Sequence, residues 1–216
     1  MAVAGDSGQA RWRVFVSHTS ELRDFPAGGS YVAAVEQAIS ACGHVIVEMA
    51  GFPAADQPAA ELCRDLVRSC DVYVGVLGAR YGSVVRDMPQ VSYTELEFDT
   101  AAEAGLHRLV FVLDAAAAEA GIPLSRRADP ESGARQEAFR RRAQDSLVTQ
   151  SFTDPGTLGQ LVERSLHALA ARQAGPARPD RAAIPLPVPY EVRRPPRSRG
   201  RQQAWLEQAG SRLWPR

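Results

Sequence analysis

The stretch DVYVGVL, residues 71–77, decides the fold of this 216-residue chain. Its apolar residues follow one another without the alternation of apolar and polar residues that marks a strand with one face in solvent. We therefore predict a central strand that is buried on both of its faces. Strands of this kind occur in parallel sheets that helices cover on both sides.

The segments around this strand alternate between strand-like and helix-like patterns. Short apolar runs that end at polar residues predict strands, and apolar residues spaced three and four apart predict amphipathic helices. The predicted strands are residues 12–17, 44–48, 71–77, 108–113 and 147–152, and the predicted helices are residues 31–41, 58–69, 92–104, 133–145 and 154–172. This order predicts an α/β fold of flavodoxin-like winding, in which helices cover both faces of a five-stranded parallel sheet of order 2-1-3-4-5.

The two ends of the chain differ in composition from its middle. Residues 1–10 lack the pattern of a signal peptide, in which positively charged residues precede an apolar segment. We expect a flexible N-terminus there. Residues 11–173 contain all the predicted elements and should form one α/β domain. Residues 174–216 hold eight of the 15 prolines and nine arginines against three carboxylates, which predicts a Pro/Arg-rich linker or tail. Within it, residues 202–214 are a candidate short helix.

Cysteine and histidine usage argues against disulfide and metal chemistry. The three cysteines form no C-x-x-C pair, and we expect free thiols in a reducing compartment. The four histidines are scattered without the spacing of metal ligands, so no metal site is predicted. No apolar run approaches the roughly 20 residues that cross a bilayer. We therefore expect a cytoplasmic protein without membrane contact.

The stretch SYTELE, residues 92–97, begins the helix that follows the central strand. Ser92 and Glu95 have the spacing of a capping box, in which Glu95 reaches back to the helix end. Glu97 lies two residues further on and points about 200° away around the helix. In open α/β sheets, ligands bind beyond the carboxyl ends of the strands. Glu97 is therefore either a solvated helix carboxylate or the functional carboxylate of a nucleotide-sized cleft.

Two loops flank this helix start in the predicted winding, and both carry polar candidates for a binding site. Ser17 and Thr19 lie at the end of the first strand, where their hydroxyls either cap the backbone or bind ribose and phosphate. Arg80 and Tyr81 follow the central strand, and either shape the loop or contact phosphate or base. Neither GxGxxG nor GxxxxGK[ST] occurs, so the dinucleotide and P-loop sites with these patterns are not supported.

Two arginine-rich segments have a simpler interpretation than a binding site. Residues 140–142 are three consecutive arginines in a predicted amphipathic helix, and we expect them to form a solvated helix face. The basic tail lacks the regular aromatic residues of nucleic-acid-binding segments. We therefore expect no nucleic-acid partner.

Four blocks of the sequence, taken in order, resemble one bacterial family. The blocks are VFVSHTSELRDF, GHVIVEMAGFPAADQPAAELC, SCDVYVGVLGARYGS and VSYTELEFDTA. They resemble the bacterial domain of unknown function 4062 (DUF4062), a TIR-like domain that usually precedes ATPase or repeat modules in larger signalling proteins. The resemblance is strong over residues 11–113 and looser up to residue 172. It implies a TIR-like fold and does not by itself define an activity.

More distant resemblances concern Glu97 itself. The wider TIR superfamily includes enzymes that cleave NAD at the nicotinamide–ribose bond, with their carboxylate in a Ser-Trp-Cys-x-x-Glu pattern. SYTELE is similar in spacing, with Tyr93 and Thr94 in place of Trp and Cys. Nucleoside deoxyribosyltransferases are similar through Thr-x-x-Glu, here Thr94 and Glu97. Both resemblances imply that Glu97, rather than Glu95, is the catalytic residue.

Taken with the DUF4062 resemblance, the more distant resemblance to NAD-cleaving TIR enzymes implies a signalling or defence domain that binds NAD or a related nucleotide and hydrolyses its N-glycosidic bond. NAD is then a substrate, and no resident cofactor is expected. The residues expected to line the site beside Glu97 are Ser17, Thr19, Arg80, Tyr81 and Ser92. Two alternatives stay open. One is a non-catalytic module that assembles with itself or with a signalling protein, and the other is an enzyme of nucleoside glycosyl transfer.

Overall fold

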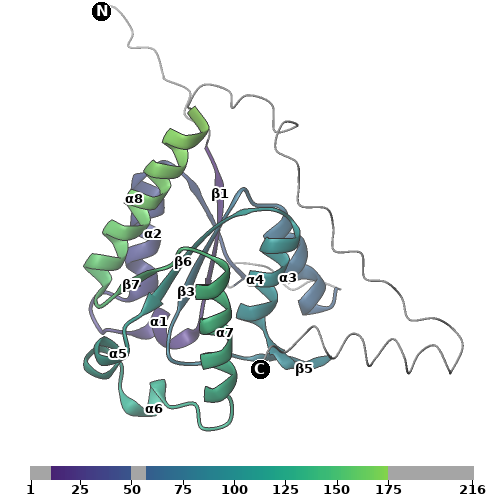
Figure 1. Cartoon of the computed structure of the whole chain (residues 1–216), viewed down its shortest axis with the longest axis vertical. Helices are drawn as coiled ribbons and strands as arrows, with labels where there is room; N and C mark the ends of the chain where they lie inside the picture. Colours follow the sequence, from purple (N-terminus) through teal and green to yellow (C-terminus); the bar gives the residue numbers. More distant parts are fainter. Residues whose placement is uncertain (1–10, 50–56, 175–216) are drawn as a thin grey trace, which may run out of the picture. The chain divides into compact units, whose positions relative to one another are not determined.

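The computed structural model describes residues 11–49 and 57–174 of the chain. Its main sheet has the order β2-β1-β3-β6-β7, and all neighbouring strands in it are parallel (Figure 1). The strands are β1 (Arg13–His18), β2 (Val45–Val47), β3 (Val72–Leu77), β6 (His107–Leu113) and β7 (Gln150–Phe152). The predicted α/β class, flavodoxin-like winding and strand order are therefore confirmed. The predictions for residues 1–10 and for the tail beyond residue 174 lie outside the described residues.

Helices cover both faces of this sheet, as predicted (Figure 1). One face is covered by α2 (Tyr31–Ala41) and α8 (Pro155–Ala174), which pack along each other. The other face is covered by α3 (Ala59–Arg68), α4 (Tyr93–Glu103) and α7 (Gly133–Ser146). In the described part of the chain, no helix combines the length and the apolar character needed to cross a membrane.

Strand β3 is the buried centre of the sheet. All six of its residues are buried. Val72, Val74 and Val76 pack into the core on the side of α2 and α8. Tyr73 and Leu77 pack into the core on the side of α3, α4 and α7. The prediction of a strand buried on both faces is confirmed, and the two cores meet through it.

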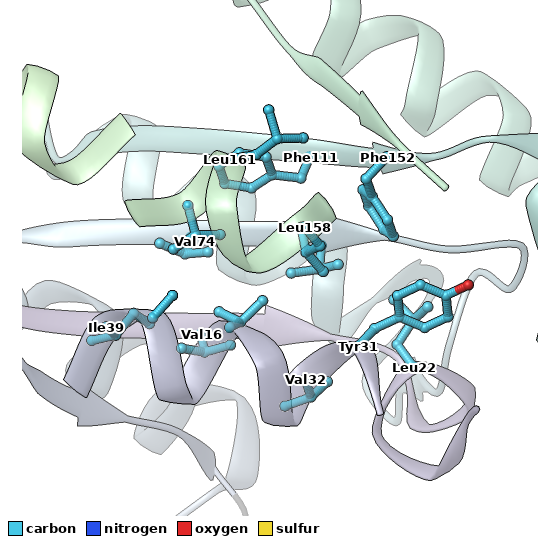
Figure 2. Close-up of a cluster of buried hydrophobic side chains, with 14 of the residues drawn as sticks. Val16, Leu22, Tyr31, Val32, Ile39, Val74, Phe111, Phe152, Leu158 and Leu161 are labelled. Atoms are coloured by element: carbon cyan, nitrogen blue, oxygen red, sulfur yellow. The ribbon is translucent and has the colours of Figure 1, made fainter. Parts of the chain in front are cut away.

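The core beneath α2 and α8 is filled with aliphatic and aromatic side chains from all the layers. Figure 2 shows these side chains converging from the strands, from α1 (Ser20–Asp24) and from the two long helices. They include Val16, Val74, Phe111 and Phe152 of the sheet, Leu22 of α1, Tyr31, Val32 and Ile39 of α2, and Leu158 and Leu161 of α8. Burial of an apolar side chain of this size contributes roughly 1.5–3 kcal/mol, so this core contributes strongly to the stability of the domain.

The start of α8 is fixed by a side-chain cap. Asp154 accepts the backbone N–H of Thr157 at 2.8 Å, and Pro155 is the first helical residue. This hydrogen bond satisfies one of the backbone donors that a helix leaves free at its first turn. The helix therefore begins within one residue of its predicted start at residue 154.

Several short elements were not predicted. They are α1, the hairpin of β4 (Val84–Val85) and β5 (Met88–Ser92), α5 (Ala115–Gly121) and α6 (Leu124–Arg127). Elements this short hold too few residues to show a helical or strand period. Strand β7 also begins later than predicted, at Gln150, because Val148 is 95% exposed and does not join the sheet.

Candidate functional site

Glu97 lies on the buried side of α4, with 7% of its surface exposed. The start of α4 is fixed by Ser92, whose hydroxyl accepts the backbone N–H of Glu95 at 3.2 Å. Ser17, next to the last residue of β1, donates its hydroxyl to Oε2 of Glu97 at 2.5 Å. The winding of the sheet changes direction between β1 and β3, and ligands of open α/β sheets bind near such a point. The structure thus brings Ser17 and Glu97 together beside the expected binding region.

Two further polar side chains complete what we call the Glu97 cluster: Ser17, Cys63, Tyr73 and Glu97. Cys63 of α3 directs its thiol toward Oε1 of Glu97, at 3.7 Å. Tyr73 of β3 is fully buried, and its hydroxyl lies beside Ser17 and Glu97 without a hydrogen-bond partner among the described residues. Gly75 makes room for this ring, because a Cβ there would lie 2.8 Å from Cε1 of Tyr73.

Burial controls the ionisation of the cluster. Desolvation raises the pKa of Glu97 to about 7, and the hydrogen bonds from Ser17 and Cys63 oppose that rise. Burial, followed by the nearby Glu97 carboxylate, raises the pKa of the Cys63 thiol and of the Tyr73 hydroxyl. Within the described residues, no arginine or histidine lies within 4.0 Å of the Glu97 carboxylate. A buried carboxylate without a cation is costly, and such groups concentrate at functional sites.

Thr19 and Arg80 meet at a second buried carboxylate, that of Glu21 in α1. Oε1 of Glu21 accepts the Thr19 hydroxyl at 2.6 Å and the Arg80 backbone N–H at 3.3 Å. Gly78 permits this approach, because a Cβ there would lie 2.7 Å from the same oxygen. Burial raises the pKa of Glu21, and the Thr19 hydrogen bond opposes the rise. The loops that follow β1 and β3 are therefore joined through Glu21.

Tyr81 and Glu95 hold the loop after β3 against α4 and α7. The Tyr81 ring is buried, and its hydroxyl donates to the Gln90 carbonyl at 2.9 Å and to the Glu95 carboxylate. Glu95 also accepts a hydrogen bond of 2.6 Å from Arg142 of α7. The predicted capping box is therefore only half correct. Ser92 caps α4, whereas Glu95 bonds to a hydroxyl and a guanidinium and does not reach back to the helix end.

The arginines of α7 also differ from the prediction of a solvated face. Arg140 is half-buried and donates to the carbonyl of Gly78 at 3.2 Å and to that of Leu113 at 2.8 Å. It thereby connects the carboxyl ends of β3 and β6. Arg141 is exposed as predicted, and Arg142 is partly exposed but paired with carboxylates of α4. The prediction is wrong for Arg140 because strand-end carbonyls accept its guanidinium.

The predicted site residues thus separate into two groups. Ser17 is hydrogen-bonded to Glu97, whereas Thr19, Arg80, Tyr81 and Ser92 bond to Glu21, to Glu95 or to backbone around the start of α4. Sequence reasoning missed Cys63, Tyr73 and Glu21. Alternation along β3 is a signal for Tyr73, since it places this residue on the side of α4. No pattern in the sequence points to Cys63 or Glu21.

The described residues contain no group of three or more His, Cys, Asp and Glu side chains that could hold a metal ion. Fold and site together define a flavodoxin-like α/β domain with a buried carboxylate cluster next to the point where the winding reverses. Residues 13–167 match the family described as a domain of unknown function, DUF4062, and the chain belongs to this family. The match includes every residue of the Glu97 cluster. None of the curated proteins matches the chain.

Proposed function

We propose that this domain binds NAD or a related nucleotide and hydrolyses its N-glycosidic bond, with Glu97 as the catalytic residue. One observation carries the proposal. The Glu97 carboxylate is buried without a cation in the described part of the chain, and Ser17 holds it beside the reversal point of the sheet. A pKa of about 7 makes a large fraction of this group anionic at neutral pH.

Cleavage of the nicotinamide–ribose bond suits a single carboxylate. Nicotinamide leaves a cationic pyridinium as a neutral base and takes the electron pair of the broken C–N bond, so no strong general acid is required. The ribose becomes oxocarbenium-like, and an anion beside it stabilises the developing charge. Water then adds to the ribose carbon and loses a proton. The anionic form of Glu97 supplies the negative charge, and the Ser17 hydroxyl orients it.

The closed state of the cluster supports a regulated role in signalling or defence. Ser17 is 1% exposed and Tyr73 is 0% exposed, so a substrate reaches Glu97 only after side chains or a helix move. In our proposal, assembly of the domain with itself or with a signalling protein opens the cluster. The substrate is then bound only when the signal is present.

The same burial favours a second candidate function, a non-catalytic interaction module. In that case the Glu97 cluster is a polar part of the core, and it joins α3 and α4 to β1 through Cys63, Glu97 and Ser17. Glycosyl transfer between nucleosides is a third option, which breaks the same type of bond and differs in the acceptor.

An assay of nicotinamide release at rising protein concentration tests the proposal. We expect release from NAD by the wild-type chain and a loss of at least about 100-fold in Glu97→Gln, the range known for removal of one electrostatic group from a catalytic site. Glu95→Gln is the matched control, since it neutralises a carboxylate on the same helix and should keep substantial activity. Transfer of the ribosyl group to an added nucleobase would indicate glycosyl transfer. Absence of release and of NAD binding at every concentration would favour the interaction module.

A further inference from the structure

A second feature of the molecule lies beside the first half of β6, on the side of that strand away from β3. It is a hollow of about 470 Å³ beside the first residues of β6. Its lining includes Arg108 and Val110 of β6, Val148 before β7, and Arg164 and Arg172 of α8. Lining groups therefore come from the sheet and from a helix on one of its faces.

The hollow lies along an open edge of the sheet. Strand β7 begins at Gln150, which pairs with Phe111, so β6 has no described strand beside residues 108–110 on this side. The other side of β6 is paired with β3 along its length. The N–H of Asp114 donates to the carbonyl of Phe152. Because backbone groups alternate in direction along a strand, the N–H groups of Arg108 and Val110 face the same open side.

Three guanidinium groups surround this edge, and each is held by a neutral group. Arg108 lies over the Phe98 ring, with 4.8 Å between its Cζ and the ring centroid. Arg164 donates to the Gln150 side chain at 3.3 Å, and Arg172 donates to a backbone carbonyl of its own helix at 3.2 Å. No carboxylate of the described residues lies within 4.0 Å of these three groups. Their charges are therefore free to bind an anionic partner.

We propose that this hollow binds an extended acidic segment of a partner protein, which pairs with β6 as an added strand. Side chains of a strand point alternately to the two faces of the sheet. Arg108 lies on the face of α4, since its guanidinium contacts Phe98, whereas Arg164 and Arg172 lie on the face of α8. Consecutive carboxylates of an added strand thus meet guanidinium groups on both faces.

The dimensions fit a segment of about four residues. Arg164 and Arg172 are eight residues apart, a rise of about 12 Å along a helix. Four residues of an extended strand span about 13 Å. A free polyphosphate would bind the guanidinium groups alone, whereas a peptide also bonds to the open backbone of β6. The chain from residue 175 to residue 216 carries nine arginines against three carboxylates, so the charge of this segment does not suit the hollow.

A fluorescent capped peptide with the core Asp-Glu-Asp-Glu tests this binding, with Asn-Gln-Asn-Gln as the uncharged peptide. We expect the full chain to bind only the acidic peptide, and more weakly as salt is raised. The double variant Arg164→Gln, Arg172→Gln should raise Kd at least tenfold with unchanged thermal unfolding. Arg141→Gln is the matched control, since it removes an exposed arginine of α7 and should leave Kd unchanged.

Hydrogen exchange separates strand addition from attraction between charges alone. Bound peptide should slow exchange of the Arg108 and Val110 amides, whereas tripolyphosphate should leave their exchange unchanged. The proposal is overturned if the acidic peptide does not bind at millimolar concentration or if the uncharged peptide binds equally well. It is also overturned if Arg141→Gln weakens binding as much as the double variant, or if bound peptide leaves the two amides unprotected. None of these outcomes depends on hydrolysis of NAD.

Discussion

The Ser17 hydroxyl donates a hydrogen bond of 2.5 Å to Oε2 of Glu97, and it joins β1 to a helix 80 residues further along the chain. Since the described residues place no cation next to Glu97, this hydroxyl and the Cys63 thiol are the groups that favour its charged form. Burial acts in the opposite direction and is the larger effect. The balance places the pKa of Glu97 at about 7, so stability and the proposed activity both depend on pH near neutrality.

The first prediction is that Glu97 makes the folded domain less stable as pH rises. Its pKa is raised from 4.5 in the unfolded chain to about 7, so the folded state binds the proton more tightly. The resulting stabilisation is complete below pH 4.5 and is lost as pH rises through 7, a change of roughly 3 kcal/mol. Urea unfolding at pH 5 and pH 8 measures it.

Glu97→Gln should abolish this part of the pH dependence, because an amide does not titrate. The comparison with wild type isolates Glu97, since Glu21, His18 and His44, whose pKa values are also shifted, titrate in both proteins. Glu95→Gln is the control and should keep the wild-type dependence. An unchanged pH dependence in Glu97→Gln would show that the carboxylate is ionised normally in the folded state.

The second prediction concerns Ser17→Ala. A hydrogen bond to a charged group contributes about 1.5–3 kcal/mol, so its loss should raise the pKa of Glu97 by at least about one unit. In the proposed reaction, the pH of half-maximal kcat/KM should move upward from about 7, and activity at pH 7 should fall. Ser83→Ala is the control, since Ser83 is exposed and contacts Tyr93 through its backbone carbonyl. An NMR titration of the Glu97 carboxyl gives the same test without turnover.

The third prediction concerns Gly82, which follows β3 with a φ of 85°. Gly82→Ala should destabilise the domain by more than Gly28→Ala. Both glycines have positive φ, which costs other residues about 1–2 kcal/mol, but a Cβ at Gly82 would also lie 3.0 Å from Cγ2 of Thr19. Nothing lies within 4 Å of a Cβ at Gly28. Equal losses in thermal unfolding would mean that the Thr19 side chain moves away from the added methyl group at no cost.

The architecture could be predicted because its signals are local. The continuous apolar run of β3 and the helical spacing of apolar residues in α2 and α8 each lie within one segment. These patterns indicate a buried sheet with helices packed on it. The hairpin of β4 and β5 escaped prediction because β4 has only two residues. The late start of β7 depends on whether Val148 reaches the sheet, which is a property of tertiary packing.

The candidate site could be predicted only in part, for a related reason. Glu97 and Ser17 could be predicted because the winding brings the end of the first strand and the start of the helix after the central strand to one region. Cys63 was missed because it is 34 residues from Glu97, in a helix whose rotation about its axis is set by packing. Arg140 was misjudged because its carbonyl partners at the ends of β3 and β6 are not visible as a sequence pattern.

The fourth prediction follows from those carbonyl partners. Arg140→Ala should lower the free energy of unfolding by about 1–3 kcal/mol, because it removes two charge-assisted hydrogen bonds to strand ends. Arg141→Ala is the matched control on the same helix. Arg141 is exposed, and its two contacts, a 3.6 Å pair with the Glu137 carboxylate and a 3.4 Å hydrogen bond to the Glu137 carbonyl, are both in solvent, so its loss should cost about 0.5 kcal/mol or less. Chemical unfolding of both variants gives the comparison, and equal losses would contradict a specific role for Arg140.

The last prediction separates the two candidate functions at Tyr73. The Tyr73 hydroxyl is buried without a hydrogen-bond partner in the described structure, a state that costs about 1–3 kcal/mol. Tyr73→Phe should therefore raise the free energy of unfolding. If the cluster is a catalytic site, the same variant should lower NAD cleavage, because the hydroxyl lies beside Ser17 and Glu97.

Tyr31→Phe is the control, since Tyr31 is buried in the other core and donates to the Thr153 carbonyl. It should lose a little stability and keep activity. A Tyr73→Phe variant that is less stable and fully active would show that the hydroxyl serves the core alone.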